Sequence, residues 1–186
     1  MNFNKHSNLQ GMHAFLSASK YNWLNYSEEH LVDAFKNYCA IQRGTELHEL
    51  ASSCIRLGVK LPRSRKTLCM YVNDAIAHSM TTEQVLYYST NCWGTADSIS
   101  FSDGVLRIYD LKTGATPAKM DQLEIYAALF CLEYEVDPHD ILIELRIYQS
   151  EEVSIHNPDP ERIVDIMNKI VLFDQRIEGI KKEEQL

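Results

Sequence analysis

The chain has 186 residues, a net charge of −8, and hydrophobic (45%) and charged (24%) contents that are ordinary for a soluble globular protein. No apolar run approaches the ~18 residues of a membrane span, and the N-terminus lacks the apolar segment of a secretory signal. The acidic balance does not favour broad non-specific DNA binding, which depends on excess Lys and Arg. We therefore expect one domain over residues 1–186, cytoplasmic and without a membrane partner.

The cysteines are odd in number, scattered, and form no Cys-x-x-Cys pair. This usage indicates reduced thiols, and it argues against a disulfide framework or a zinc ribbon. We interpret them as small core residues: Cys39, Cys54, Cys69, Cys92 and Cys131.

The first third of the chain is predicted to be helical, because apolar residues recur there at helical spacing behind capping residues. Glu28 and Glu29 favour the positive end of one helix dipole. The expected helices begin after Ser17 or Ser19, at Ser27, at Gly44 and at Lys66; the third ends at Gly58 and the fourth near Ser79.

The rest of the chain alternates strands and helices. Strands are expected over residues 85–90, 92–101 and 105–112, then a helix over 118–134, strands over 141–148 and 153–155, and a final helix from Pro160. The charged tail, residues 176–186, is expected to fray. This order predicts an α/β fold in which helices flank a mixed sheet.

Asp103-Gly104 lies between two alternating apolar runs, which is the strongest short-range signal for a β-hairpin. A two-residue loop sets a register in which Asp97 faces Asp110 on the side of the sheet shared by the hairpin's apolar residues, with Lys112 one step further. Two opposed carboxylates repel each other unless a cation lies between them. The hairpin therefore predicts a divalent-metal site with a lysine beside it.

Short motifs surround this hairpin. They are Gly44-x-x-x-His48, Gly94-x-x-Asp97, Asp110-x-Lys112-Thr-Gly114, and Gln122 with Tyr126 one helical turn later. In this order they resemble the PD-(D/E)XK nuclease superfamily, specifically its RecB-like exonuclease branch with small phage-encoded members. The resemblance spans about residues 13–150. Tyr109 departs from the small residue that many relatives carry before Asp110, and we expect it to face away from the site.

The resemblance implies a restriction-endonuclease-like core and a role for each motif residue. His48, Asp97, Asp110 and the backbone carbonyl of Leu111 would bind the metal. Lys112 would orient or deprotonate the attacking water, and Gln122 and Tyr126 would hold the substrate strand or brace the metal's ligands. Oxygen ligands favour Mg²⁺ or Mn²⁺, and the single imidazole favours Mn²⁺. We expect no iron–sulfur cluster, because the cysteines lack the arrangement found in some relatives.

Five basic residues lie between Arg56 and Lys66, in a segment that also reads as a solvated loop around Pro62. The DNA contacts that we predict are Lys60, Arg63, Arg65, Lys66 and Lys119.

The function expected from the resemblance is a metal-dependent deoxyribonuclease, more exo- than endonucleolytic, used in recombination or DNA processing by a phage in its host's cytoplasm. Its partners would be DNA, further copies of the chain, or a recombination protein. One alternative is a nuclease-fold protein that binds DNA ends or a host defence protein without turnover, which the acidic surface favours. The other is hydrolysis of RNA or nucleotides by the same site.

Overall fold

The computed structural model describes residues 4–184, and the chain groups into two compact units, residues 1–45 and 46–186. The first unit contains the 3-10 helices η1 (Ser7–Leu9) and η2 (Ala18–Asn25) and the beginning of helix α1 (Glu28–Leu57). Its aromatic rings cluster, with Phe15 5.1 Å from Phe35 and 5.3 Å from Tyr38 between ring centroids. Every described residue up to 43 remains at least partly exposed.

Helix α1 is a single helix, so the expected separate helices starting at Ser27 and Gly44 are wrong in that respect. The cap at Ser27 is confirmed, since its hydroxyl accepts a hydrogen bond from the backbone N–H of His30 at 3.2 Å. Gly44 does not begin a helix but lies within α1. A glycine inside a helix costs about 1 kcal/mol, which the strong helix formers around it offset.

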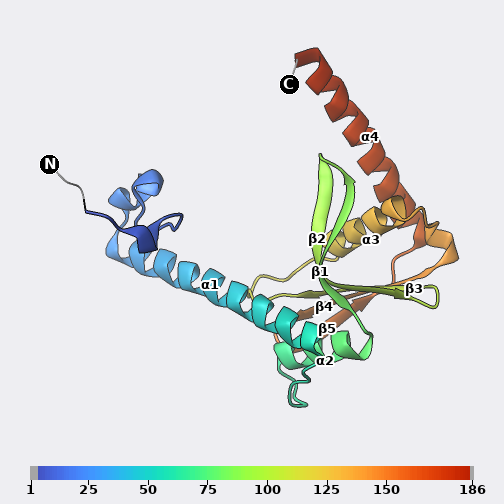
Figure 1. Cartoon of the computed structure of the whole chain (residues 1–186), viewed down its shortest axis with the longest axis horizontal. Coiled ribbons are helices and arrows are strands. Elements are labelled where there is room, and N and C mark those ends of the chain that lie inside the picture. Colours follow the sequence, from blue (N-terminus) through green and yellow to red (C-terminus); the bar gives the residue numbers. More distant parts are fainter. Residues whose placement is uncertain (1–3, 185–186) are drawn as a thin grey trace. The chain divides into compact units, whose positions relative to one another are not determined.

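The second unit is an α/β body with a five-stranded mixed sheet flanked by helices, as expected (Figure 1). Its elements are the end of α1, α2 (Thr67–Ala77), β1 (Thr81–Ser89), β2 (Cys92–Ser102), β3 (Val105–Leu111), α3 (Asp121–Glu133), η3 (Pro138–Asp140), β4 (Leu142–Gln149), β5 (Glu152–His156) and α4 (Pro160–Glu184). The strands lie in sequence order; β3 and β4 are parallel, and the other neighbours are antiparallel. Helix α4 includes the tail expected to fray up to Glu184, and residues 185–186 lie outside the described part.

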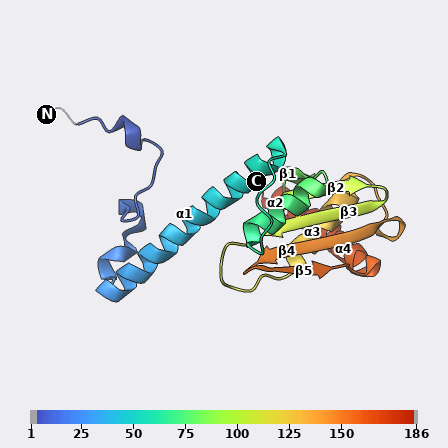
Figure 2. The ribbon, with the colours of Figure 1, turned by 90° about the horizontal axis from the view of Figure 1, so that it is seen from below.

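The sheet is covered on both faces (Figure 2). On one face α3 buries Leu123 and Ala127 in a cluster with sheet residues such as Ile108. On the other, α2 packs Tyr71 in a cluster with Tyr109. Tyr109 therefore points away from α3, and its hydroxyl donates a hydrogen bond to Glu144 at 2.9 Å.

The central hairpin has the predicted two-residue loop. Asp103 and Gly104 both have positive φ, 52° and 73°, which is the backbone that Asp-Gly favours in such turns. The register is confirmed from Ser102 opposite Val105 to Ser98 opposite Tyr109. The ladder ends there, one pair before Asp97 and Asp110.

Beyond this pair β2 and β3 part. The first half of β2 pairs with β1 alone, whereas the end of β3 continues beside β4. We call this place, where Asp97 on β2 meets Asp110 on β3, the strand fork.

The alternation of β2 also breaks at the strand fork. Ala96 and Ile99 are three residues apart, yet both are buried in the cluster with α3. A strand with strict period two would place them on opposite faces. Opposite Asp97, Glu83 of β1 has a φ of 54°, which distorts the pairing. The expectation that Asp97 shares the side of Ile99 is therefore wrong: Asp97 lies on the side opposite Ala96, away from α3.

Candidate metal centre

Three of the predicted catalytic side chains meet at the strand fork. Asp97 comes from β2, Asp110 from β3, and Lys112 from the residue after the end of β3. Their side chains are 20%, 4% and 31% exposed, respectively, so the site has a buried floor and an open mouth.

The Asp97 carboxylate takes the place of a strand partner for one backbone N–H of β3, because β2 and β3 no longer pair there. Its Oδ2 accepts a hydrogen bond from the backbone N–H of Leu111 at 3.0 Å. His48 of α1 approaches the same oxygen, with its Nδ1 at 3.4 Å. The imidazole predicted from a distant helix thus lies beside the first carboxylate.

Asp110 is held by Lys112 through one oxygen. The Lys112 Nζ donates a hydrogen bond to Oδ1 at 2.9 Å. It lies equally close to Oδ2, but no donor reaches Oδ2 in hydrogen-bonding geometry, and this atom is buried. The Lys112 ammonium therefore offsets the charge of Asp110, and Oδ2 keeps lone pairs for a further donor or a second cation.

A chain of hydrogen bonds leads from Lys112 to α3. Lys112 Nζ donates to Gln122 Oε1, and Gln122 Nε2 donates to the Tyr126 hydroxyl, each at 3.0 Å. The Tyr126 ring occupies the space over Gly94, where an added Cβ would lie 2.8 Å from Cε1. Gly94 is therefore needed because the Tyr126 ring leaves no room for a side chain, and not because the backbone has a positive φ there.

The electrostatics of the site favour a bound cation. Burial and the neighbouring Asp110 raise the pKa of Asp97 to about 6, against the opposing effects of the Leu111 N–H, His48 and Lys112. Tyr71 is buried, and that burial together with the charges of Asp97 and Asp110 raises the pKa of its hydroxyl, so it stays neutral. Sequence reasoning missed Tyr71, because only the packing of α2 brings it to the site.

The oxygen and imidazole groups at the strand fork are of the kinds that bind a hard divalent ion. Within residues 4–184, no three His, Cys, Asp or Glu side chains converge in metal-binding geometry. Lys112 supplies the positive charge beside Asp110. Carboxylate oxygens with one imidazole suit Mg²⁺ or Mn²⁺. Metal binding by His48, Asp97, Asp110 and the Leu111 carbonyl stays a prediction.

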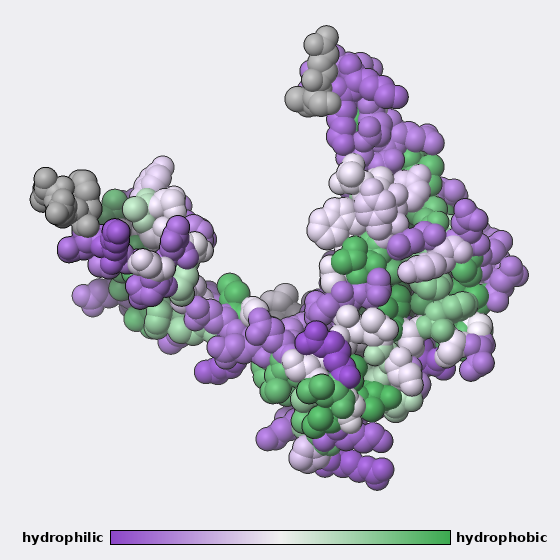
Figure 3. Space-filling view, in the orientation of Figure 1, coloured by the Kyte–Doolittle hydropathy of each residue, from purple (hydrophilic) through white to green (hydrophobic). Residues whose placement is uncertain are grey.

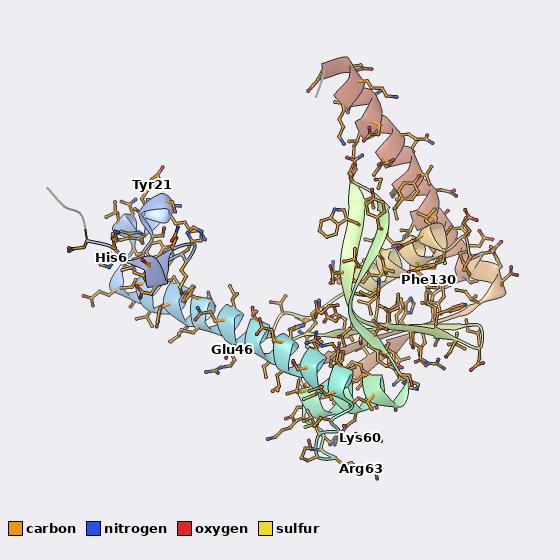
Figure 4. The ribbon with its side chains drawn as sticks, in the orientation of Figure 1. His6, Tyr21, Glu46, Lys60, Arg63 and Phe130 are labelled. Atoms are coloured by element: carbon orange, nitrogen blue, oxygen red, sulfur yellow. The ribbon has the colours of Figure 1, made fainter. Side chains whose placement is uncertain are left out.

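The predicted basic residues are exposed and fall in two places. Lys60 and Arg63 lie on the loop between α1 and α2, beside a hollow of about 370 Å³, and point away from the sheet (Figure 4). Arg65 and Lys66 follow on the same loop, and Lys119 precedes α3. The residue after Lys66 lines a second hollow, of about 350 Å³, together with Lys112.

Comparisons of the chain with protein-family models, with curated proteins and with solved structures found no match. Among the residues that the structure describes, no helix has both the length and the apolar character needed to cross a membrane. The interpretation of the site therefore depends on its geometry.

Proposed function

We propose that the protein is a divalent-metal-dependent deoxyribonuclease with a restriction-endonuclease-like core. The observation that carries this proposal is the strand fork itself, where two carboxylates lie close together and the Lys112 ammonium is 2.9 Å from the buried Oδ2 of Asp110. The mixed sheet with its central hairpin and flanking helices supports the fold assignment.

Each residue of the site has a task in phosphodiester hydrolysis. Asp97 and Asp110, with His48, would hold Mg²⁺ or Mn²⁺, which polarises the phosphate and lowers the pKa of a bound water. Lys112 is positioned by Asp110 and Gln122, so its ammonium is fixed to orient the attacking water and to stabilise developing charge. Tyr126 braces Gln122 from α3.

A hollow beside Lys112 that could hold the substrate backbone also supports the proposed nuclease function. The hollow of about 350 Å³ joins Lys112 and Thr113 to Thr67, which opens α2 directly after the basic loop. Arg65 and Lys66 directly precede Thr67 in the chain and are exposed. A local basic patch of this kind can guide a phosphate chain on an acidic protein.

The test is cleavage of linear single- and double-stranded DNA in Mg²⁺, Mn²⁺ or EDTA. We expect cleavage only with a divalent ion, and a loss of at least about 100-fold in Lys112→Ala and Asp110→Asn. Lys182→Ala, at an exposed lysine near the end of α4, is the matched control and should retain full activity. Cleavage that survives Lys112→Ala contradicts the mechanism, and no cleavage of either DNA form contradicts the function.

A second candidate is a protein of the same fold that binds DNA ends or a host protein without turnover. The net charge of −8 favours it, because an acidic surface suits protein contact better than contact with long DNA. Tight binding of a partner with no metal-dependent cleavage in the same assays would select this function.

A further inference from the structure

The hairpin formed by β1 and β2 carries an exposed aromatic pair. Tyr87 lies opposite Trp93, and Val85 opposite Thr95, so these four side chains share one side. Trp93 is 59% exposed, Tyr87 46% and Val85 45%. We call these four residues the aromatic face.

The other side of the hairpin is packed and holds the aromatic face in place. Leu86 and Ala96 are fully buried in the cluster with α3, and Gly94 contacts the Tyr126 ring. The hairpin turn is tied to α4, where Asn91 Nδ2 donates to Asp174 at 2.8 Å and to Glu178 at 2.7 Å. The exposed rings therefore stand on a fixed support, which lowers the entropy lost on binding.

The segment that carries the aromatic face has no charged side chain of its own, and the charge nearest to it is the Glu133 carboxylate of α3, which accepts a hydrogen bond from the Tyr87 backbone N–H at 2.8 Å. Residues 84–96 include no Asp, Glu, Lys or Arg, although charged residues make up 24% of the chain. In Figure 3 this hairpin is pale, whereas the end of α4 is strongly hydrophilic. A polyanion can approach here with less repulsion than at the acidic surface elsewhere.

The aromatic face runs directly into the candidate metal centre. Trp93, Thr95 and Asp97 alternate along β2 on the side away from α3, because Ala96 between them faces α3. Four strand residues span about 13 Å.

We propose that the aromatic face binds single-stranded DNA by stacking unpaired bases on Trp93 and Tyr87, and so delivers the strand to the strand fork. This deepens the proposed function and rests on it. In duplex DNA the base faces are covered by their neighbours, whereas unpaired bases stack on aromatic side chains whatever their sequence. The lack of Lys and Arg here means that this contact depends only weakly on salt.

The experiment measures binding in EDTA, so that no strand is cut. The chain has two tryptophans, and Trp23→Phe leaves Trp93 as the single tryptophan, whose emission is excited selectively over that of the tyrosines. We expect an oligothymidylate to quench Trp93 fluorescence, and a blunt duplex of equal length to quench it little. In anisotropy titrations, Trp93→Ala should weaken single-strand binding about 10-fold, and Trp93→Phe should restore most of it. Tyr134→Ala, at the 52% exposed tyrosine that directly follows α3, is the matched control.

Several results would overturn the proposal. They are unchanged single-strand affinity in Trp93→Ala, the absence of quenching, or a loss of affinity for duplex alone. Should Trp93→Ala fail to fold, Tyr87→Ser decides by the same titration. If the wild type cleaves DNA but the variants bind single strands as tightly as it does, the stacking contact is rejected and the nuclease function stands. If oligothymidylate quenches Trp93 but the protein cleaves no DNA, the nuclease function is rejected and the stacking contact stands.

Discussion

Replacing Asp97 by Asn should stabilise the metal-free protein while abolishing its metal-dependent activity. In the metal-free state the Asp97 carboxylate is mostly buried and lies close to Asp110, and these two effects raise its pKa to about 6. Asparagine removes the charge but keeps an oxygen that can accept the Leu111 N–H. The catalytic arrangement is thus expected to reduce the stability of the fold.

The size of the effect follows from the pKa. A rise from the ordinary value of 3.8 to about 6 means that the ionised form is destabilised by about 3 kcal/mol, at about 1.4 kcal/mol per pKa unit. The amide has its own desolvation cost, so we expect a net gain of about 2 kcal/mol at pH 8. For a chain of this size that corresponds to a melting temperature higher by about 4–8 °C.

The pH dependence has a definite sign. Because the folded-state pKa is the higher one, the ionised carboxylate destabilises the fold above about pH 6, and this penalty fades as the pH falls toward 3.8. The advantage of Asp97→Asn should therefore be full at pH 8 and much smaller at pH 4.5. Urea titrations and thermal melts in EDTA at the two pH values measure it.

Asp165→Asn, at an exposed aspartate of α4, is the matched control and should change stability by less than about 0.5 kcal/mol. An Asp97→Asn variant that is no more stable than wild type at pH 8 would refute the reasoning. So would a gain of equal size at both pH values, because a titrating carboxylate could not produce it.

Other changes test the surroundings of the site. Gly94→Ala forces the Tyr126 ring to move and should lower the rate of cleavage by about 10- to 100-fold. A kcat equal to that of the wild type would contradict this role of Gly94. Glu124→Ala removes a buried acceptor of Arg162, at 2.9 Å, and of His156; we expect a loss of about 2 kcal/mol in a urea titration, against no change in exposed Glu183→Ala. Mn²⁺ at 100 times its Kd should stabilise the wild type by about 2.7 kcal/mol, and His48→Ala should need more Mn²⁺ for the same rise in melting temperature; an equal response of both proteins would exclude His48 as a ligand.

Local signals in the sequence were sufficient for the hairpin and its register. Asp103-Gly104 specifies a tight turn through two residues, and the register follows from the turn because strand pairing is periodic. The place of Lys112 beside Asp110 follows in the same way, because the two residues lie two positions apart. The order of helices and strands around them was also predictable from periodicity.

What the sequence could not predict depends on contacts between distant segments. The strand fork arises because β2 pairs with β1 while β3 pairs with β4, and the local pattern contains neither choice. The break of alternation between Ala96 and Ile99 accompanies the left-handed Glu83 on another strand. Gly44 was misread as a helix start because a glycine inside a helix and one at its end look alike in a single sequence.

The hydrogen bond from the Leu111 N–H to Asp97 makes one backbone amide a sensor of the site. In an ordinary ladder this amide would be shielded by a neighbouring strand, but here a titratable side chain shields it. Its rate of exchange with deuterated water should therefore report directly whether the carboxylate is seated. A single amide resonance would then follow the assembly of the metal centre without any substrate, and would distinguish loss of the site from loss of the fold.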